Sequence, residues 1–324
     1  MRRRDFITLF GGAAVAWPLA ALAQEPGRTY RLGIVSAATR NIPAYVAMTE
    51  ELRRLGFIEG KNLTIDFRSY GPRTDLIPEF VAELVQAHVD VIQVNGEAAT
   101  RAAQQATTTI PILAGSEDMV GSGLVKSMAR PGGNTTGMST LGTELDGKRQ
   151  KILIEAVPGL RRMAALADSN ATEPRELQAL QEAAHARDVE LSVHKVAKGE
   201  EIAAAIDKAH ALGAAALNVL SSPFLYGNRR IIMEHVVTLR LPTIYPFQEE
   251  AEEGGFAAYG PSLIQLFREL IAHQLVKLLR GVKPSDIPVE QPTKFGLVLN
   301  LKTAKAMGVT VPAILVARAD KVIE

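Results

Sequence analysis

Residues 110–137 read IPILAGSEDMVGSGLVKSMARPGGNTTG, and this stretch decides how the chain is organised. Its first five residues are apolar and lead to Gly115, which predicts a strand buried on both faces of a parallel sheet. Ser116, Glu117 and Asp118 then place a hydroxyl and two carboxyls at the carboxyl end of this strand. Open α/β sheets bind their ligands at that edge, so we expect part of a ligand site here.

The second half of the same stretch redirects the chain. Gly121 and Gly123 allow a turn, and residues 124–128 are predicted to form a short helix that RPGGN, at 130–134, ends. Residues 135–139 are predicted to be extended. One series of strands and helices therefore ends near Ser139, and a second series begins after it.

Strands and helices alternate on both sides of this point. Strands separated by helices of 10–15 residues indicate βαβ units, parallel sheets and right-handed crossovers. Two such series predict an α/β fold with two Rossmann-like lobes; one large doubly wound sheet is the alternative. The predicted strands are 30–35, 63–67, 89–94, 163–167, 189–196, 214–220, 242–245 and 256–259, and the predicted helices include 43–55, 72–88, 145–157, 173–187, 200–212, 228–239 and 262–279.

Composition narrows the classes of protein that this chain can belong to. The chain has 324 residues, 47% of them hydrophobic, so it can bury a sizeable core, and its length suggests about two domains. Its net charge of +1 gives no electrostatic reason to expect nucleic acid or an anionic membrane as a partner. The absence of cysteine excludes disulfides, thiolate catalysis and Cys-ligated zinc.

The N-terminus has the pattern of an export signal. Three arginines at positions 2–4 precede an apolar run over residues 7–23, and Ala-Leu-Ala stands before Gln24. We therefore predict a signal peptide over residues 1–23 that is cleaved near Ala23, which leaves a soluble periplasmic protein. A membrane anchor is the alternative, but a span needs about 20 apolar residues. The Arg-Arg-x-Phe-Ile order resembles a twin-arginine signal, with the general secretory route as the other possibility.

Several enzyme signatures are missing from the sequence. No GxGxxG or GxxxxGK[ST] motif occurs, so a dinucleotide or P-loop site is not expected. The six histidines have no HExxH spacing, which argues against a metal site. No G-x-S-x-G elbow follows a predicted strand. We expect neither cofactor nor metal, and a hydrolase or reductase acting in a cleft remains the minor hypothesis.

Polar and aromatic side chains instead gather where the predicted strands end. Hydroxyls, amides and carboxyls from two lobes would face each other across a cleft, which suits a small polar or zwitterionic ligand. Residues of these types also cap helices at such places, so each one alone has a structural alternative. The candidate ligand contacts are Ser36, Asn95, Glu97, Ser116, Asp118, Asn170, Ser221 and Tyr245.

Six segments together carry a family resemblance: LRRLGFIEGKNLTIDFR (52–68), TTTIPI (107–112), ARPGGNTTG (129–137), ELDGKR (144–149), YGPSL (259–263) and PVEQPTKFGLVLNLKTAKAMG (288–308). With them the sequence resembles the periplasmic substrate-binding components of ABC transporters, in the branch whose members bind tryptophan and tyrosine. The resemblance covers nearly the whole chain after the signal.

The resemblance implies a periplasmic binding protein type I fold, with two lobes joined by a three-strand hinge that closes over the ligand. Crossings are expected near Ser139, near Tyr259 and within residues 295–301. The first lobe would comprise residues 28–139 and 260–297, and the second residues 140–259 and 298–324. The resemblance also implies a monomer that delivers an aromatic amino acid or a related acid to an ABC permease. A periplasmic sensor for a receptor kinase is the runner-up.

The sequence departs from this family at its strand ends. Family members commonly have Gly-Thr-Pro where this chain has Gly-Glu-Ala at 96–98, Asp-Pro where it has Asp118-Met119, and often Ser-Asp where it has Ser221-Ser222. The fold is therefore expected to carry over, whereas the ligand of the relatives is only a guide.

Overall fold

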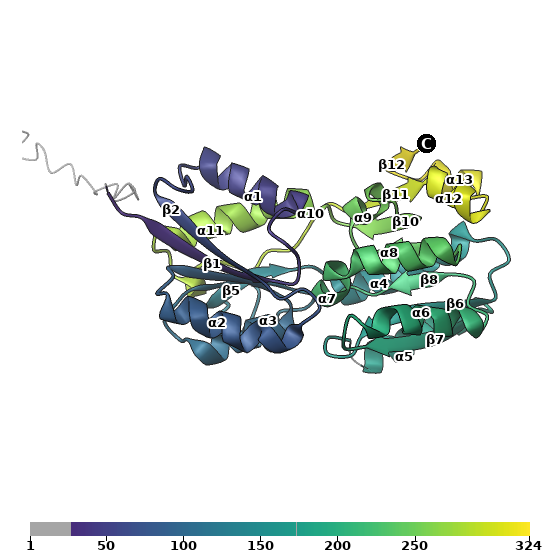
Figure 1. The fold of residues 1–324 in the computed structure, drawn as a ribbon, viewed down its shortest axis with the longest axis horizontal. Helices are drawn as coiled ribbons and strands as arrows, with labels where there is room; N and C mark the ends of the chain where they lie inside the picture. The colour runs from purple at the N-terminus through teal and green to yellow at the C-terminus, as the bar shows by residue number, and fades with distance from the viewer. Residues whose placement is uncertain (1–26, 173) are drawn as a thin grey trace, which may run out of the picture.

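The computed structural model describes residues 27–172 and 174–324, which form two lobes side by side along the longest axis (Figure 1). The predicted signal peptide and its cleavage at Ala23 lie outside the described residues. In the described part of the chain, no helix is both long enough and apolar enough to span a membrane.

The first lobe is built on a five-stranded sheet with the order β2-β1-β3-β4-β5, in which every neighbouring pair is parallel. Successive residues of β4 pack on opposite faces: Leu113 joins one hydrophobic cluster, while Ile112 and Ala114 join the other. This confirms that the apolar run is a strand buried on both sides. The strands are β1 (Tyr30–Ser36), β2 (Leu63–Ser69), β3 (Val91–Asn95), β4 (Ile112–Ser116) and β5 (Thr135–Ser139).

Helices from distant parts of the sequence cover this sheet. One face packs on α1 (Pro43–Arg54) together with α10 (Leu263–Leu266), the π-helical turn η2 (Phe267–Ile271) and α11 (Ala272–Leu279), which return from the far end of the chain. The other face packs on α2 (Ile77–Gln86) and α3 (Glu97–Ala106). Two short turns, η1 (Thr74–Leu76) and η3 (Pro284–Asp286), complete the lobe.

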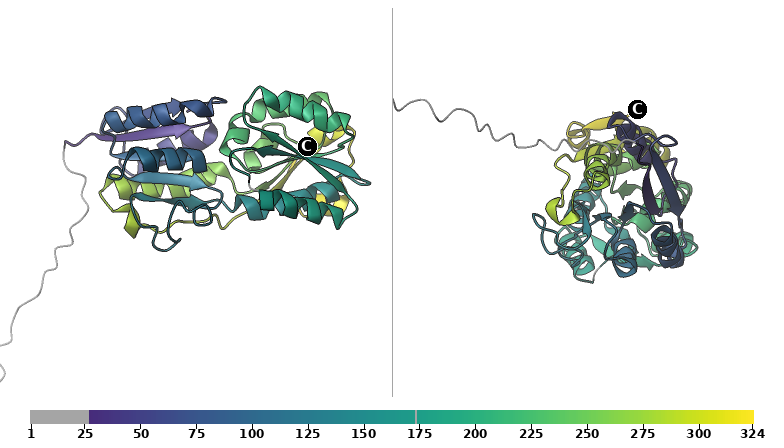
Figure 2. Two further views of the ribbon diagram at one scale, coloured as in Figure 1. Left: turned by 90° about the horizontal axis from the view of Figure 1, so that it is seen from below. Right: turned by 90° about the vertical axis from the view of Figure 1, so that its left-hand side faces the viewer.

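The second lobe holds a seven-stranded sheet with the order β12-β11-β10-β9-β8-β6-β7, and helices lie on both of its faces (Figure 2). Its core is one continuous hydrophobic cluster. The strands are β6 (Arg162–Asp168), β7 (Glu190–Val196), β8 (Leu217–Val219), β9 (Thr243–Tyr245), β10 (Ala257–Gly260), β11 (Gly296–Asn300) and β12 (Lys321–Ile323). The helices are α4 (Gly142–Ala156), α5 (Pro174–His185), α6 (Glu201–Ala211), α7 (Pro223–Gly227), α8 (Arg229–Thr238), α9 (Gln248–Glu252), α12 (Leu301–Met307) and α13 (Ala313–Val316).

The chain passes between the lobes three times, as the resemblance implied. Residues 140–141 link β5 to α4, residues 261–262 link β10 to α10, and residues 291–295 lead from the first lobe into β11. Because β11 enters from the hinge side, it pairs antiparallel with β10, so the second sheet is not wholly parallel. The expected lobe boundary between residues 297 and 298 stays a prediction, and it would cut β11.

The buried side chain of Arg149 connects two of these crossings. Its Nη2 donates to the carbonyl oxygen of Gly142 (3.1 Å), at the first crossing, and its Nη1 donates to the carbonyl oxygen of Tyr259 (3.2 Å), at the second. Its Nε also donates to the carboxylate of Asp146 (3.1 Å), and both charged side chains are 1% exposed. A buried ion pair thus anchors the second lobe's side of the hinge.

Gly137 in β5 is required for this strand to pair with β4. Its φ is +148°, and a Cβ at this position would lie 1.8 Å from the carbonyl oxygen of Ala114 in β4. Only glycine therefore allows β5 to approach β4 closely enough to pair with it.

One sequence prediction about secondary structure is wrong. Residues 124–128 form irregular, bent backbone rather than a helix, and the amides of Leu124 and Val125 both donate to the carbonyl oxygen of Met119. The long helix predicted over 262–279 is confirmed: α10, η2 and α11 follow one another without a break, and η2 is a π-helical turn within that helix. The helix predicted over 228–239 is α8, and a separate helix, α7, precedes it.

Candidate ligand-binding site

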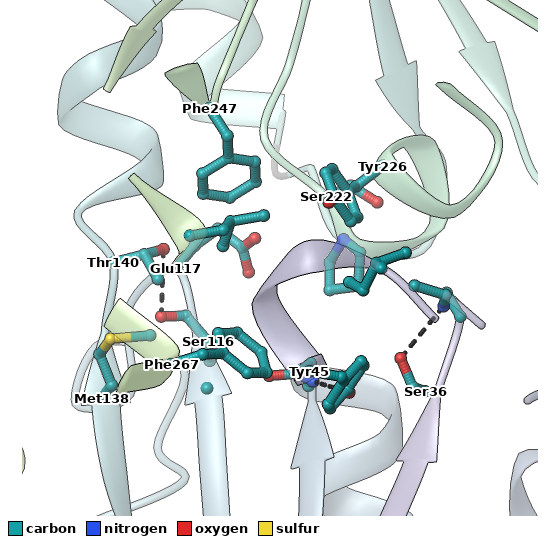
Figure 3. Close-up of a pocket in the computed structure, with 17 residues that line it drawn as sticks. Ser36, Tyr45, Ser116, Glu117, Met138, Thr140, Ser222, Tyr226, Phe247 and Phe267 are labelled. Atoms are coloured by element: carbon teal, nitrogen blue, oxygen red, sulfur yellow. Dashed lines mark hydrogen bonds between the residues drawn. The ribbon is translucent and has the colours of Figure 1, made fainter. Parts of the chain in front are cut away.

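A cavity of about 70 Å³ lies between the lobes, at the carboxyl ends of strands from both sheets (Figure 3). The first lobe supplies the ends of β1, β3 and β4 together with residues of α1, α10 and η2, while the second supplies the segments after β8 and β9. Seventeen residues line it: Ser36, Ala37, Ala38, Ile42, Tyr45, Asn95, Gly115, Ser116, Glu117, Met138, Thr140, Ser222, Pro223, Tyr226, Phe247, Leu263 and Phe267.

Two pairs of aromatic rings, one from each lobe, form much of the wall. Tyr45 and Phe267 of the first lobe stack edge to face with centroids 5.0 Å apart, and Tyr226 and Phe247 of the second do so at 5.5 Å. The guanidinium of Arg229 lies over the Tyr226 ring, 4.4 Å from its centroid, and pairs with Glu253. These contacts hold the rings in fixed orientations around the cavity.

Most side-chain donors at the cavity are already engaged by other protein groups. The Nδ2 of Asn95 donates to the Tyr45 hydroxyl (3.1 Å), which in turn donates to Gln93 Oε1 (3.4 Å). The Ser222 hydroxyl donates to Asp168 Oδ2 (2.7 Å) and caps α7 by accepting from two of its amides. Burial raises the pKa of Tyr45, so its hydroxyl stays neutral.

Glu117 is the one lining residue with a charged side chain, and Figure 3 shows its carboxyl pointing into the space lined by Phe247 and Phe267. The side chain retains some exposure because it borders the cavity. It also reaches the second lobe: Ser221 Oγ donates to its Oε1 (3.4 Å), and a Cβ on Gly142 would lie 2.6 Å from its Cγ. Desolvation raises the pKa of Glu117 to about 7, with Asp146 and Asp168 adding to the increase.

The structure brings some of the predicted site residues together. Ser36, Asn95 and Ser116 line the cavity. Ser221 is buried and contacts the cavity only through Glu117. Their role as ligand contacts stays a prediction.

Two other predicted residues lie at a neighbouring cavity of about 340 Å³, which shares Asn95 and Pro223 with the first. Glu97 lines this second cavity and pairs with Arg101 (2.7 Å). Asn170 also lines it, and its backbone amide donates to the Asp168 carboxylate (2.9 Å).

The last two predicted residues lie at neither cavity. Asp118 is exposed, and its Oδ1 accepts hydrogen bonds from the amides of Val120 (3.1 Å) and Gly121 (2.8 Å). It therefore has the turn-capping role that was its structural alternative. Tyr245 is fully buried in the core of the second lobe.

Four aromatic residues line the cavity without being among the eight candidate contacts. Phe267 and Tyr45 lie on helices, and from sequence alone an apolar side chain on a helix is interpreted as part of the hydrophobic core. Tyr226 and Phe247 follow β8 and β9, and they belong to the strand-end aromatic residues that the sequence predicted to face the cleft, although they were not among the candidate contacts. Glu117 stands between Ser116 and Asp118 at the end of β4, but only those two neighbours were predicted to contact the ligand.

No group of three or more His, Cys, Asp or Glu side chains that could hold a metal ion occurs within residues 27–172 and 174–324. The site is a largely apolar cavity whose lining includes four aromatic rings and one carboxyl.

Comparison with known proteins gives one family and several similar structures. The family described as "ABC transporter substrate binding protein" matches residues 37–323. A tyrosine-binding protein of Clostridioides difficile is 23% identical over 257 residues, which are 78% of this chain and 72% of that protein.

Two crystal structures share the fold over 91% of this chain and 100% of their own. One is a conserved domain protein from Vibrio cholerae, with a TM-score of 0.81 and 21% identity. The other is an ABC domain from Streptococcus pneumoniae in complex with L-Trp, with a TM-score of 0.80 and 20% identity.

Proposed function

Because this chain belongs to the ABC transporter substrate-binding protein family, we propose that the cavity between its lobes encloses a small ligand for delivery to an ABC permease. The observation that carries this proposal is the lining itself: residues of both lobes and Thr140 of the hinge border one space. A ligand there contacts both lobes only when they are together, so binding favours the closed form.

We propose an aromatic or compact apolar body for this ligand. The two edge-to-face ring pairs offer flat apolar walls, and the relatives include a tyrosine-binding protein and a complex with L-Trp. At about 70 Å³ the cavity holds roughly five water-sized groups, since each needs about 10–15 Å³. A larger ligand therefore requires some opening of the lobes.

The cellular setting belongs to the same proposal. We propose that residues 1–23 direct export, that cleavage near Ala23 releases a monomer into the periplasm, and that the protein binds its ligand without turnover. Sequencing the N-terminus of the exported protein should give Gln24 as its first residue. Replacing Arg3 and Arg4 with Lys should block export by the twin-arginine route; unchanged export would indicate the general secretory route.

The binding itself is tested with a thermal-shift screen of amino acids, amines and aromatic acids on the mature protein, combined with native mass spectrometry. A ligand at one hundred times its Kd stabilises the folded state by about 2.7 kcal/mol. Stoichiometric recovery of unchanged ligand supports a binding protein, whereas conversion to a product would indicate the hydrolase or reductase.

A matched pair of variants places any such ligand in the cavity. Phe267→Leu changes a cavity wall, while Phe57→Leu removes a ring of the same hydrophobic cluster that does not line the cavity. Both variants should lose stability, but only Phe267→Leu should lose affinity, by about tenfold or more. Equal affinity in the two variants would place the ligand elsewhere.

A further inference from the structure

The cavity contains one carboxyl and no basic side chain, which constrains the charge of its ligand. None of the seventeen lining residues is Lys, Arg or His. The guanidinium of Arg229 lies behind the Tyr226 ring and is neutralised by Glu253, while Arg149 is buried against Asp146. An anionic group in this space would meet no counter-ion.

We propose that Glu117 recognises a protonated amine on the ligand, and that a ligand carboxylate contributes nothing to affinity. This inference rests on the proposed function, since it concerns the ligand of the same cavity. Glu117 thereby becomes the residue that determines specificity for ligand charge.

The aromatic walls favour the same kind of ligand. The faces of Tyr and Phe rings carry negative electrostatic potential, so they attract an ammonium group and disfavour an anion. Tyr45, Tyr226, Phe247 and Phe267 all border the space into which the Glu117 carboxyl points (Figure 3). A cation there is held by the carboxyl and by ring faces together.

The hydrogen-bonding groups at the cavity also offer little to a carboxylate. The amide of Asn95 and the hydroxyls of Tyr45 and Ser222 all donate to protein acceptors. A ligand carboxylate would reach these three groups only by displacing those bonds. The hydroxyls of Ser36, Ser116 and Tyr226 also line the cavity, but they are neutral donors and supply no counter-charge. The carboxyl of Glu117 has Ser221 as a weak donor at 3.4 Å, which leaves acceptor capacity for an ammonium.

The groups that surround Glu117 determine how binding depends on pH. Asp146 on α4 and Asp168 at the end of β6 face Glu117 from the second lobe. Glu176, on α5 of the same lobe, also interacts with it electrostatically, as does Tyr70 of the first lobe. Arg149 is the cation of this group, and it is paired with Asp146. Amine binding should therefore strengthen as the pH rises through about 7, when Glu117 becomes charged.

Two matched sets of probes test the inference by calorimetry at pH 8 on the mature protein. The first set is tyramine, tyrosine and 3-(4-hydroxyphenyl)propionate; the second is tryptamine, tryptophan and indole-3-propionate. Within a set the ring is constant and only the charged groups change. In at least one set, we expect the amine to bind no more weakly than the amino acid, and the propionate at least tenfold more weakly than either.

Variants connect the preference to one side chain. Glu117→Gln keeps the shape and removes the charge, and it should weaken amine binding by tenfold or more. Asp118→Asn is the matched control, because the neighbouring carboxyl is exposed and outside the cavity; it should leave the affinity unchanged.

Three results would overturn the inference: a propionate that binds as well as its amine, an amine affinity that Glu117→Gln does not change, or no binding by any probe of either set. The proposed function is judged separately. An anionic or neutral ligand found in the wider screen, and sensitive to Phe267→Leu, would refute the inference while leaving the binding function in place.

Discussion

The substitution Glu117→Gln should change how the stability of the ligand-free protein depends on pH. The pKa of Glu117 is raised from its usual 4.5 to about 7, chiefly by desolvation. Below pH 4.5 the carboxyl is neutral in both the folded and the unfolded chain, and it adds no pH dependence. Between pH 4.5 and about 7 the unfolded chain releases the proton while the folded protein keeps it, so stability falls as the pH rises.

The size of this effect follows from the same values. The difference between 4.5 and about 7 corresponds to at most about 3.5 kcal/mol, at roughly 1.4 kcal/mol for each pKa unit. Gln at this position is neutral at every pH. The variant should therefore match the natural protein at pH 4.5 and exceed its free energy of unfolding by up to about 3.5 kcal/mol at pH 8, or its Tm by up to about 10 °C.

Thermal and urea denaturation at pH 4.5, 6 and 8, without ligand, measure this difference. Burial also raises the pKa of Asp168, Glu176 and Glu250, but these carboxyls are present in both proteins. Removing the Glu117 charge lessens repulsion on Glu176, which acts in the same direction. A stability difference that is the same at all three pH values would refute the argument that Glu117 is desolvated.

Three further predictions concern the fold and the hinge. Gly137→Ala should destabilise by about 2 kcal/mol or more, because its Cβ would clash with a backbone oxygen; in thermal denaturation Gly133→Ala, which also has positive φ but open space, should cost less. Arg149→Met should cost roughly 3–5 kcal/mol in urea denaturation by leaving the buried Asp146 unpaired, and adding Asp146→Leu should recover most of it. X-ray scattering should show compaction when an identified ligand is added, and identical curves would argue against hinge closure.

The sequence was sufficient to predict those strands and helices whose pattern lies within the element itself or next to it in the chain. β4 begins as a continuous apolar run that ends at glycine, and β1 is apolar apart from Arg31 and its final Ser36. α7 starts at a Ser-Pro pair that caps it, a pattern that was present but not used. The antiparallel pairing of β11 with β10 had no local signal. It depends on the side from which the chain enters the second lobe, and only the assembled topology fixes that.

The candidate site was predictable to the extent that it lies at strand ends. Ser36, Asn95 and Ser116 were found in this way, because the carboxyl ends of parallel strands meet at one edge. The choice between Glu117 and Asp118 was not decidable from sequence. Neighbouring residues after a strand point in different directions, and the turn that engages one carboxylate leaves the other to face the cavity. Phe267 carried no signal, since its position on a helix is that of a core residue.

The return of α10, η2 and α11 to the first lobe has a consequence for how the protein is made. These elements, residues 263–279, cover one face of a sheet whose strands end at Ser139. A nascent chain that has emerged from the ribosome only as far as β10 therefore has all five strands of that sheet but lacks half of its cover. The N-terminal lobe cannot be completed before most of the C-terminal lobe has been translated, so a truncated chain exposes apolar surface on which it can aggregate. Synthesis of the two lobes is interleaved: the first lobe is completed by residues 263–286, and the second lobe needs β11 and β12 from the end of the chain.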